Sequence, residues 1–137
     1  MMLKGRGVIP GVVEGEALVC PESIQGWAGV DDFTGKIIEK GNSQFGERIT
    51  DRVLVIPCSK GSNGWSCHFH AAKESGNCPS ALVVSKIDSK VAVGAVVMDV
   101  PTVCDFKEVN PCACIHTGDW VRVDGTKGTV EVLKTKK

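Results

Sequence analysis

The sequence predicts one mixed α/β domain that is built mainly from short strands. Its 137 residues are enough to bury a core within a single domain spanning residues 1–137. Twenty valines and eight isoleucines outnumber five leucines, and branching at Cβ favours strands over helices. Sixteen glycines and six prolines divide the chain into short segments, as an architecture of many strands requires.

The charge balance and the apolar pattern disfavour several classes of protein. Sixteen basic and sixteen acidic residues cancel, whereas a surface that binds duplex nucleic acid needs a basic excess. The sequence has no apolar run of about 18 residues and no apolar signal-peptide region at its start. We therefore expect a cytoplasmic protein without nucleic-acid or membrane partners, in which most of the seven cysteines stay reduced.

The first third of the chain reads as strand, loop and short strand. Residues 7–20 predict a strand in which Gly11 and Gly15 produce a bend or bulge. Residues 25–36 predict a glycine-rich loop with Asp31 as a turn residue. Residues 36–40 are then expected to form a short strand.

The middle of the chain predicts a βαβ unit. Residues 52–57 and residues 80–85 are short, continuous apolar runs, typical of strands that are buried on both faces. Residues 66–75 lie between them and can form a helix that Gly76 would end. This order of strand, helix and strand places the two strands in parallel.

The last third ends in a predicted β-hairpin. Residues 90–97 fit either a helix or a strand, and residues 100–103 predict a short buried strand. Apolar and polar residues alternate over 120–124 and again over 129–133, on either side of a turn at 125–128.

The glycine-rich turn Gly61–Ser66 is the first candidate site. It follows a predicted buried strand and opens a helix, where unpaired backbone N–H groups and the helix dipole attract anions. Ser62 could lie where these N–H groups stabilise an alkoxide or hold a carboxylate, and Lys60 adds a positive charge nearby. The alternative is a serine that merely caps the helix on a tight turn.

A second candidate is a group of thiols and imidazoles: Cys67, His68, His70, Cys78, Cys112 and Cys114. Zinc takes four nitrogen or sulfur ligands, and these residues could supply part of such a site. The C-x-C pair could also contact an iron–sulfur cluster that is held elsewhere. However, no C-x-x-C pair occurs, and buried cysteines commonly pack as small hydrophobic residues.

An ordered series of motifs over nearly the whole chain resembles the small, swivelling subunit of the aconitase X family. Each motif is weak alone, but their order and spacing together are specific. They are GRGVIPGVVEGEALV (5–19), GWAGVDDFTGKI (26–37), GERITDRVLVIP (46–57), KGS (60–62), PSALVV (79–84), VAVGAVV (91–97), VPTV (100–103) and TGDWVRVDG (117–125).

The resemblance implies a swivelling β/β/α domain with a βαβ core and a C-terminal hairpin. It also implies a heterodimeric hydro-lyase, in which a large subunit holds iron or an iron–sulfur cluster and the small subunit is inactive alone. The substrate would be a small hydroxy acid, either cis-3-hydroxy-L-proline or (R)-5-phosphomevalonate. Archaeal members read GSTVGSY where this chain reads GSNGWSC, a departure that leans slightly towards hydroxyproline.

The same resemblance assigns Ser62 as the proton acceptor. A free serine is a poor base, so its alkoxide needs stabilisation by N–H groups or cations. Lys60 would supply charge, while Gly61, Asn63 and Gly64 would let the backbone bind the substrate. Two further functions remain open at this point, namely a non-catalytic binding or regulatory swivel module and a zinc-stabilised structural domain.

Overall fold

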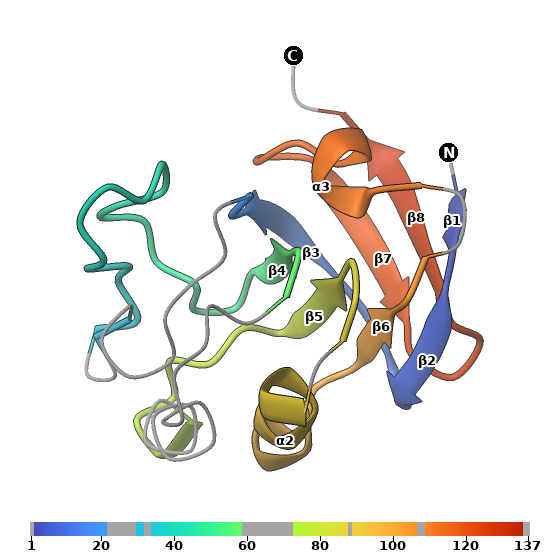
Figure 1. The fold of residues 1–137 in the computed structure, drawn as a ribbon, viewed down its shortest axis with the longest axis horizontal. Helices are drawn as coiled ribbons and strands as arrows, with labels where there is room; N and C mark the ends of the chain where they lie inside the picture. Colours follow the sequence, from blue (N-terminus) through green and yellow to red (C-terminus); the bar gives the residue numbers. More distant parts are fainter. Residues whose placement is uncertain are drawn as a thin grey trace.

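A computed structural model describes residues 2–21, 30–31, 34–58, 73–87, 89–106 and 109–135. A sheet of eight strands dominates it, with helices beside the sheet (Figure 1). The strands are β1 (Met2–Lys4), β2 (Arg6–Ile9), β3 (Val12–Val19), β4 (Val53–Ile56), β5 (Ala81–Val84), β6 (Thr102–Cys104), β7 (Trp120–Asp124) and β8 (Thr129–Lys134). The helices are α2 (Ser89–Met98) and α3 (Pro111–Cys114).

The strands follow the order β1-β8-β7-β3-β4-β5-β6-β2. Strands β3 to β6 pair in parallel, whereas β1, β8 and β7 pair antiparallel with one another and β7 pairs antiparallel with β3. Strand β2 is antiparallel to β6. Because only Gly5 separates β1 from β2, which lie at opposite ends of this order, the sheet curls back on itself.

The parallel strands are buried on both faces. On one face, the side chains of Leu18, Leu54 and Leu82 share a core cluster with α2. On the other face, alternate residues of the same strands pack against the inner side chains of β1, β7 and β8. The successive layers are therefore a helix, a parallel sheet and an antiparallel sheet, which confirms the predicted mixed β/β/α architecture.

The two parallel strands of the predicted βαβ unit and the C-terminal hairpin are confirmed. Strands β4 and β5 consist entirely of buried residues and pair in parallel, while β7 and β8 flank the turn 125–128. Lys73 and Glu74 are helical and Gly76 has φ +76°, as expected where a helix ends. The rest of the helix predicted over 66–75 lies outside the described residues, apart from Ser75.

The first third of the chain differs from expectation in two places. In place of one bent strand over 7–20, β2 and β3 are separate, and β1 precedes them without a sequence signal. Within residues 36–40, Lys36 and Ile37 form isolated bridges to Arg48 and Val30 instead of a strand, because the backbone of the following segment closes turns within 39–47. Asp31 is in a turn as predicted, since its carbonyl accepts the Gly35 N–H at 2.7 Å.

The ambiguous segment 90–97 belongs to helix α2. Val91, Ala95 and Met98 are buried against the parallel strands, and this spacing of three and four residues suits a helix. None of the helices in the described part of the chain has the length and apolar character needed to cross a membrane.

Candidate active site at the carboxyl edge of the parallel strands

The carboxyl ends of the four parallel strands lie at one edge of the sheet. The side chains that follow them there are Cys20 after β3, Cys58 after β4, Ser85 after β5 and Asp105 after β6. Ligands of α/β sheets generally bind outside this edge. The edge is therefore where we place the candidate active site.

The loop that contains Ser62 leaves β4 at this edge. Pro57 and Cys58 follow β4 directly and are the last described residues before the loop. The predicted site residues Lys60, Gly61, Ser62, Asn63 and Gly64 lie outside the described residues, as do Cys67, His68 and His70. Chain connectivity thus puts the start of the loop at the carboxyl edge, and the roles of these side chains remain predictions.

Backbone hydrogen bonds hold the start of this loop against the segment after β5. The Ser85 N–H donates to the Ile56 carbonyl at 3.0 Å, and the Lys86 N–H donates to the Pro57 carbonyl at 2.9 Å. The β4–β5 pairing therefore continues beyond the last paired residues of both strands.

A small polar cluster lies beside the start of the loop. The hydroxyl of Ser85 donates to Oδ1 of Asn110 at 3.2 Å and lies 3.9 Å from Sγ of Cys112. Asn110 also caps α3 by accepting the Cys112 N–H at 3.0 Å, with Pro111 in the first turn. Sequence reasoning missed α3, although an asparagine followed by proline is a typical helix start.

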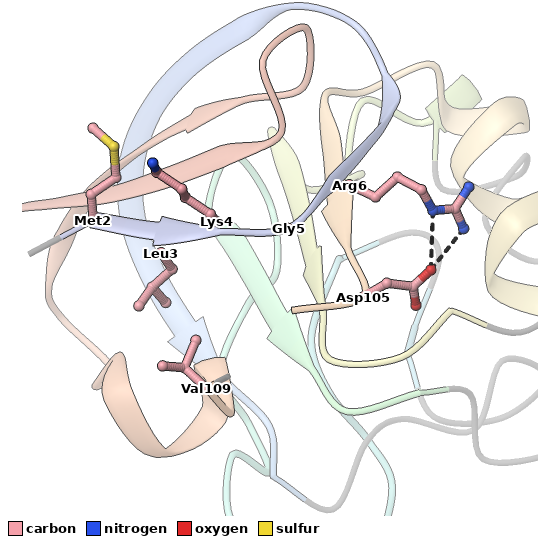
Figure 2. A pocket seen from close by; sticks show the side chains of 7 residues that line it. All are labelled: Met2, Leu3, Lys4, Gly5, Arg6, Asp105 and Val109. Carbon is pink, nitrogen blue, oxygen red and sulfur yellow. Dashed lines mark hydrogen bonds and ion pairs between the residues drawn. The ribbon is translucent and has the colours of Figure 1, made fainter. Parts of the chain in front are cut away.

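An ion pair lies next to this cluster, at the end of β6. Nε and Nη2 of Arg6 donate to Oδ2 of Asp105 at 3.2 and 2.7 Å, and the Ile87 N–H donates to Oδ1 at 3.0 Å. The Arg6 hydrogen bond, followed by that of Ile87, lowers the pKa of the Asp105 carboxyl. A pocket of about 680 Å³ opens beside the pair (Figure 2). Sequence reasoning did not single out either residue, because they are 99 positions apart.

The described residues offer no complete metal site. No three His, Cys, Asp or Glu side chains converge among them as a metal ion requires. Burial raises the pKa of the Cys78 and Cys112 thiols, which opposes the thiolate form that a metal binds. The possible contribution of Cys67, His68 and His70 to a zinc site lies outside the described residues.

The six described cysteines are all thiols and differ widely in exposure. Cys58 is exposed, whereas burial and the neighbouring Asp105 raise the pKa of Cys104 to about 11. At pH 8 only about one in a thousand Cys104 side chains would then be thiolate, the reactive form. We expect iodoacetamide to modify Cys58 well before Cys104, as measured by peptide mass spectrometry. Modification of Cys104 at the rate of Cys58 in the folded protein would contradict the buried position of Cys104.

Comparisons with known proteins agree with this architecture over nearly the whole chain. The model of the aconitase X swivel domain family matches residues 2–132. Phosphomevalonate dehydratase small subunits of Methanocella arvoryzae and Pyrococcus furiosus are 39% and 37% identical, covering 96% and 97% of this chain and 99% and 96% of theirs. The crystal structure of Thermococcus kodakaraensis aconitase X (holo-form) superposes with a TM-score of 0.91 at 34% identity, covering 98% of this chain and 99% of that one. The chain belongs to the aconitase X swivel domain family.

Proposed function

We propose that this chain is the small subunit of a phosphomevalonate dehydratase, a hydro-lyase that removes water from (R)-5-phosphomevalonate. The observation that carries the proposal is the similarity to curated subunits of that name over 96% of this chain and 99% of the relative. It favours phosphomevalonate over cis-3-hydroxy-L-proline, to which the loop sequence by itself leaned slightly. A large subunit is the corresponding partner.

We assign the proton abstraction to Ser62. Dehydration of a hydroxy acid takes a proton from the carbon next to the carboxylate, so a base must lie within hydrogen-bond reach of that carbon. Ser62 follows β4 by six residues and its loop starts at the carboxyl edge. Lys60 and the backbone N–H groups around Gly61, Asn63 and Gly64 would stabilise the serine alkoxide and the developing enolate. The iron or iron–sulfur cluster of the enzyme is proposed to belong to the large subunit.

The test is an assay of the assembled enzyme. The chain would be co-expressed with the large subunit of its host, purified without oxygen and incubated with (R)-5-phosphomevalonate or cis-3-hydroxy-L-proline. We expect the two-chain complex, and neither chain alone, to remove one water from phosphomevalonate, as measured by mass spectrometry of the product. Turnover of hydroxyproline alone would overturn the proposed substrate. A stable complex that dehydrates neither compound would overturn the proposed function.

A further inference from the structure

Among the described residues, Arg6 is paired with a carboxylate on one side only. Its Nε and Nη2 both donate to Oδ2 of Asp105, and no second carboxylate of the described residues forms an ion pair with it. The Arg6 side chain is 63% exposed. A guanidinium has five donors in a planar fork, so its Nη1 and Nη2 side can still bind a further anion.

The other arginines with ion pairs are enclosed by acids. Arg122 contacts Glu14 through Nε and Nη2 and contacts Glu131 through Nη1. Arg52 is likewise flanked by Glu16 and Glu47. Like Arg6, Arg122 is exposed and donates through Nε and Nη2 to one carboxylate. Unlike Arg6, it has a second acid, Glu131, at the Nη1 position that an external anion would need. It is therefore the matched control for Arg6.

Hydrogen bonds and close backbone packing hold the Arg6–Asp105 pair in place. Asp105 has φ +57°, a left-handed conformation that aspartate adopts more readily than most residues and that Asp51 and Asp99 share. Gly5 lies against the end of β6, where an added Cβ would be 2.5 Å from the Cys104 carbonyl oxygen. An exposed ion pair contributes little to stability. Two hydrogen bonds from Arg6 and one from the Ile87 N–H hold the Asp105 carboxylate, and with it the guanidinium, in one orientation.

Arg6 lies at the same edge of the sheet as the start of the Ser62 loop. Asp105 follows β6, and Cys58, the last described residue before the loop, follows β4. The ends of these two strands are two strand spacings apart, roughly 10 Å. The pocket beside the pair carries Arg6 and Asp105 at one end, while Leu3 and Val109 point towards each other at the other end (Figure 2). A molecule with a carboxylate near the loop could thus place a second anionic group on Arg6.

We propose that Arg6, oriented by Asp105, binds the phosphate group of the substrate. This inference rests on the proposed function, which supplies a substrate with a phosphate at the end remote from the reacting carbon. A phosphate monoester presents several oxygens to the Nη1 and Nη2 donors, and such a bidentate, charge-assisted contact is strong and directional. Arg6 is then a specificity-determining residue that makes no contact with the reacting atoms.

Steady-state kinetics of the two-chain complex test this contact. We expect Arg6→Gln to raise KM for phosphomevalonate roughly 10–100-fold, with kcat within a few-fold of wild type. Arg6→Lys should raise KM less than Arg6→Gln does, because lysine keeps the positive charge but lacks the planar set of N–H donors. Asp105→Asn should give a smaller rise because the guanidinium is no longer held in one orientation. Arg122→Gln should leave both constants unchanged, and an equal effect of Arg122→Gln would overturn the assignment.

Inorganic phosphate separates this inference from the proposed function. Calorimetry should show that inorganic phosphate binds the wild-type complex and does not bind the Arg6→Gln complex. This result is expected even if phosphomevalonate is not the substrate. Suppose that the Arg6→Gln complex dehydrates phosphomevalonate with the KM and the phosphate affinity of wild type. The phosphate site at Arg6 would then be overturned, whereas the proposed function would stand. Weaker subunit association with an unchanged KM would instead show that Arg6 pairs with an acidic side chain of the large subunit.

Discussion

Replacing Ser62 by alanine is expected to lower kcat of the assembled enzyme by roughly 10²–10⁴-fold, the usual contribution of a positioned proton acceptor. The hydroxyl oxygen is the proposed proton acceptor, and alanine leaves the loop with a similar backbone and no acceptor. In the proposed mechanism, substrate binding is assigned to other groups, namely Lys60, the loop backbone and Arg6. KM for phosphomevalonate should therefore stay within a few-fold of wild type.

Two serine variants are the controls for Ser62→Ala. Ser66→Ala removes a hydroxyl from the same loop, and Ser85→Ala removes the hydroxyl that donates to Asn110 beside the start of that loop. Both should retain most of the turnover, because neither is assigned a proton transfer. The measurement is single-turnover and steady-state kinetics on complexes whose subunit stoichiometry has been checked. Near-normal turnover of Ser62→Ala would exclude this serine as the proton acceptor.

The second large effect is expected where the chain crosses itself at Gly7 and Gly125. A Cβ added at Gly7 would overlap the carbonyl oxygen of Gly125, and one added at Gly125 would overlap the carbonyl oxygen of Ile9. Both clashes are with backbone, which a side-chain rotation cannot relieve. We expect Gly7→Ala and Gly125→Ala each to lower the free energy of unfolding by about 3 kcal/mol or more. For a chain of this size that corresponds to a fall in Tm of roughly 10 °C.

Gly76→Ala is the matched control for this crossing. Gly76 has φ +76°, and an added Cβ there would meet no atom within 4 Å. Its substitution should cost only the backbone penalty, about 1 kcal/mol. Urea unfolding followed by circular dichroism measures all three variants. If Gly7→Ala and Gly125→Ala were no more destabilising than Gly76→Ala, the close backbone approach would not govern stability here.

The elements that the sequence predicted correctly are those with a strong local signal. Strands β4 and β5 are continuous apolar runs because both of their faces are buried. The hairpin alternates because β7 and β8 each have one buried and one more exposed face. By contrast, α2 reads as either helix or strand, and its burial against Leu18 and Leu54 selects the helix. β1 has three residues and forms only by pairing with β8, more than a hundred positions away.

The candidate site likewise has a part that the sequence predicts and a part that only the folded chain shows. The sequence by itself determined the fold class through its composition, the family resemblance through the order of its motifs, and the choice of Ser62 through the glycine-rich turn after a strand. Each of these signals lies in residues that are close together in the chain. Only the tertiary structure placed Arg6 beside Asp105 at the carboxyl edge, because that contact joins residues 99 positions apart. Neither residue carries a local pattern that reveals its partner. Their proximity follows from the pairing of β2 with β6, which exists only once the chain has folded.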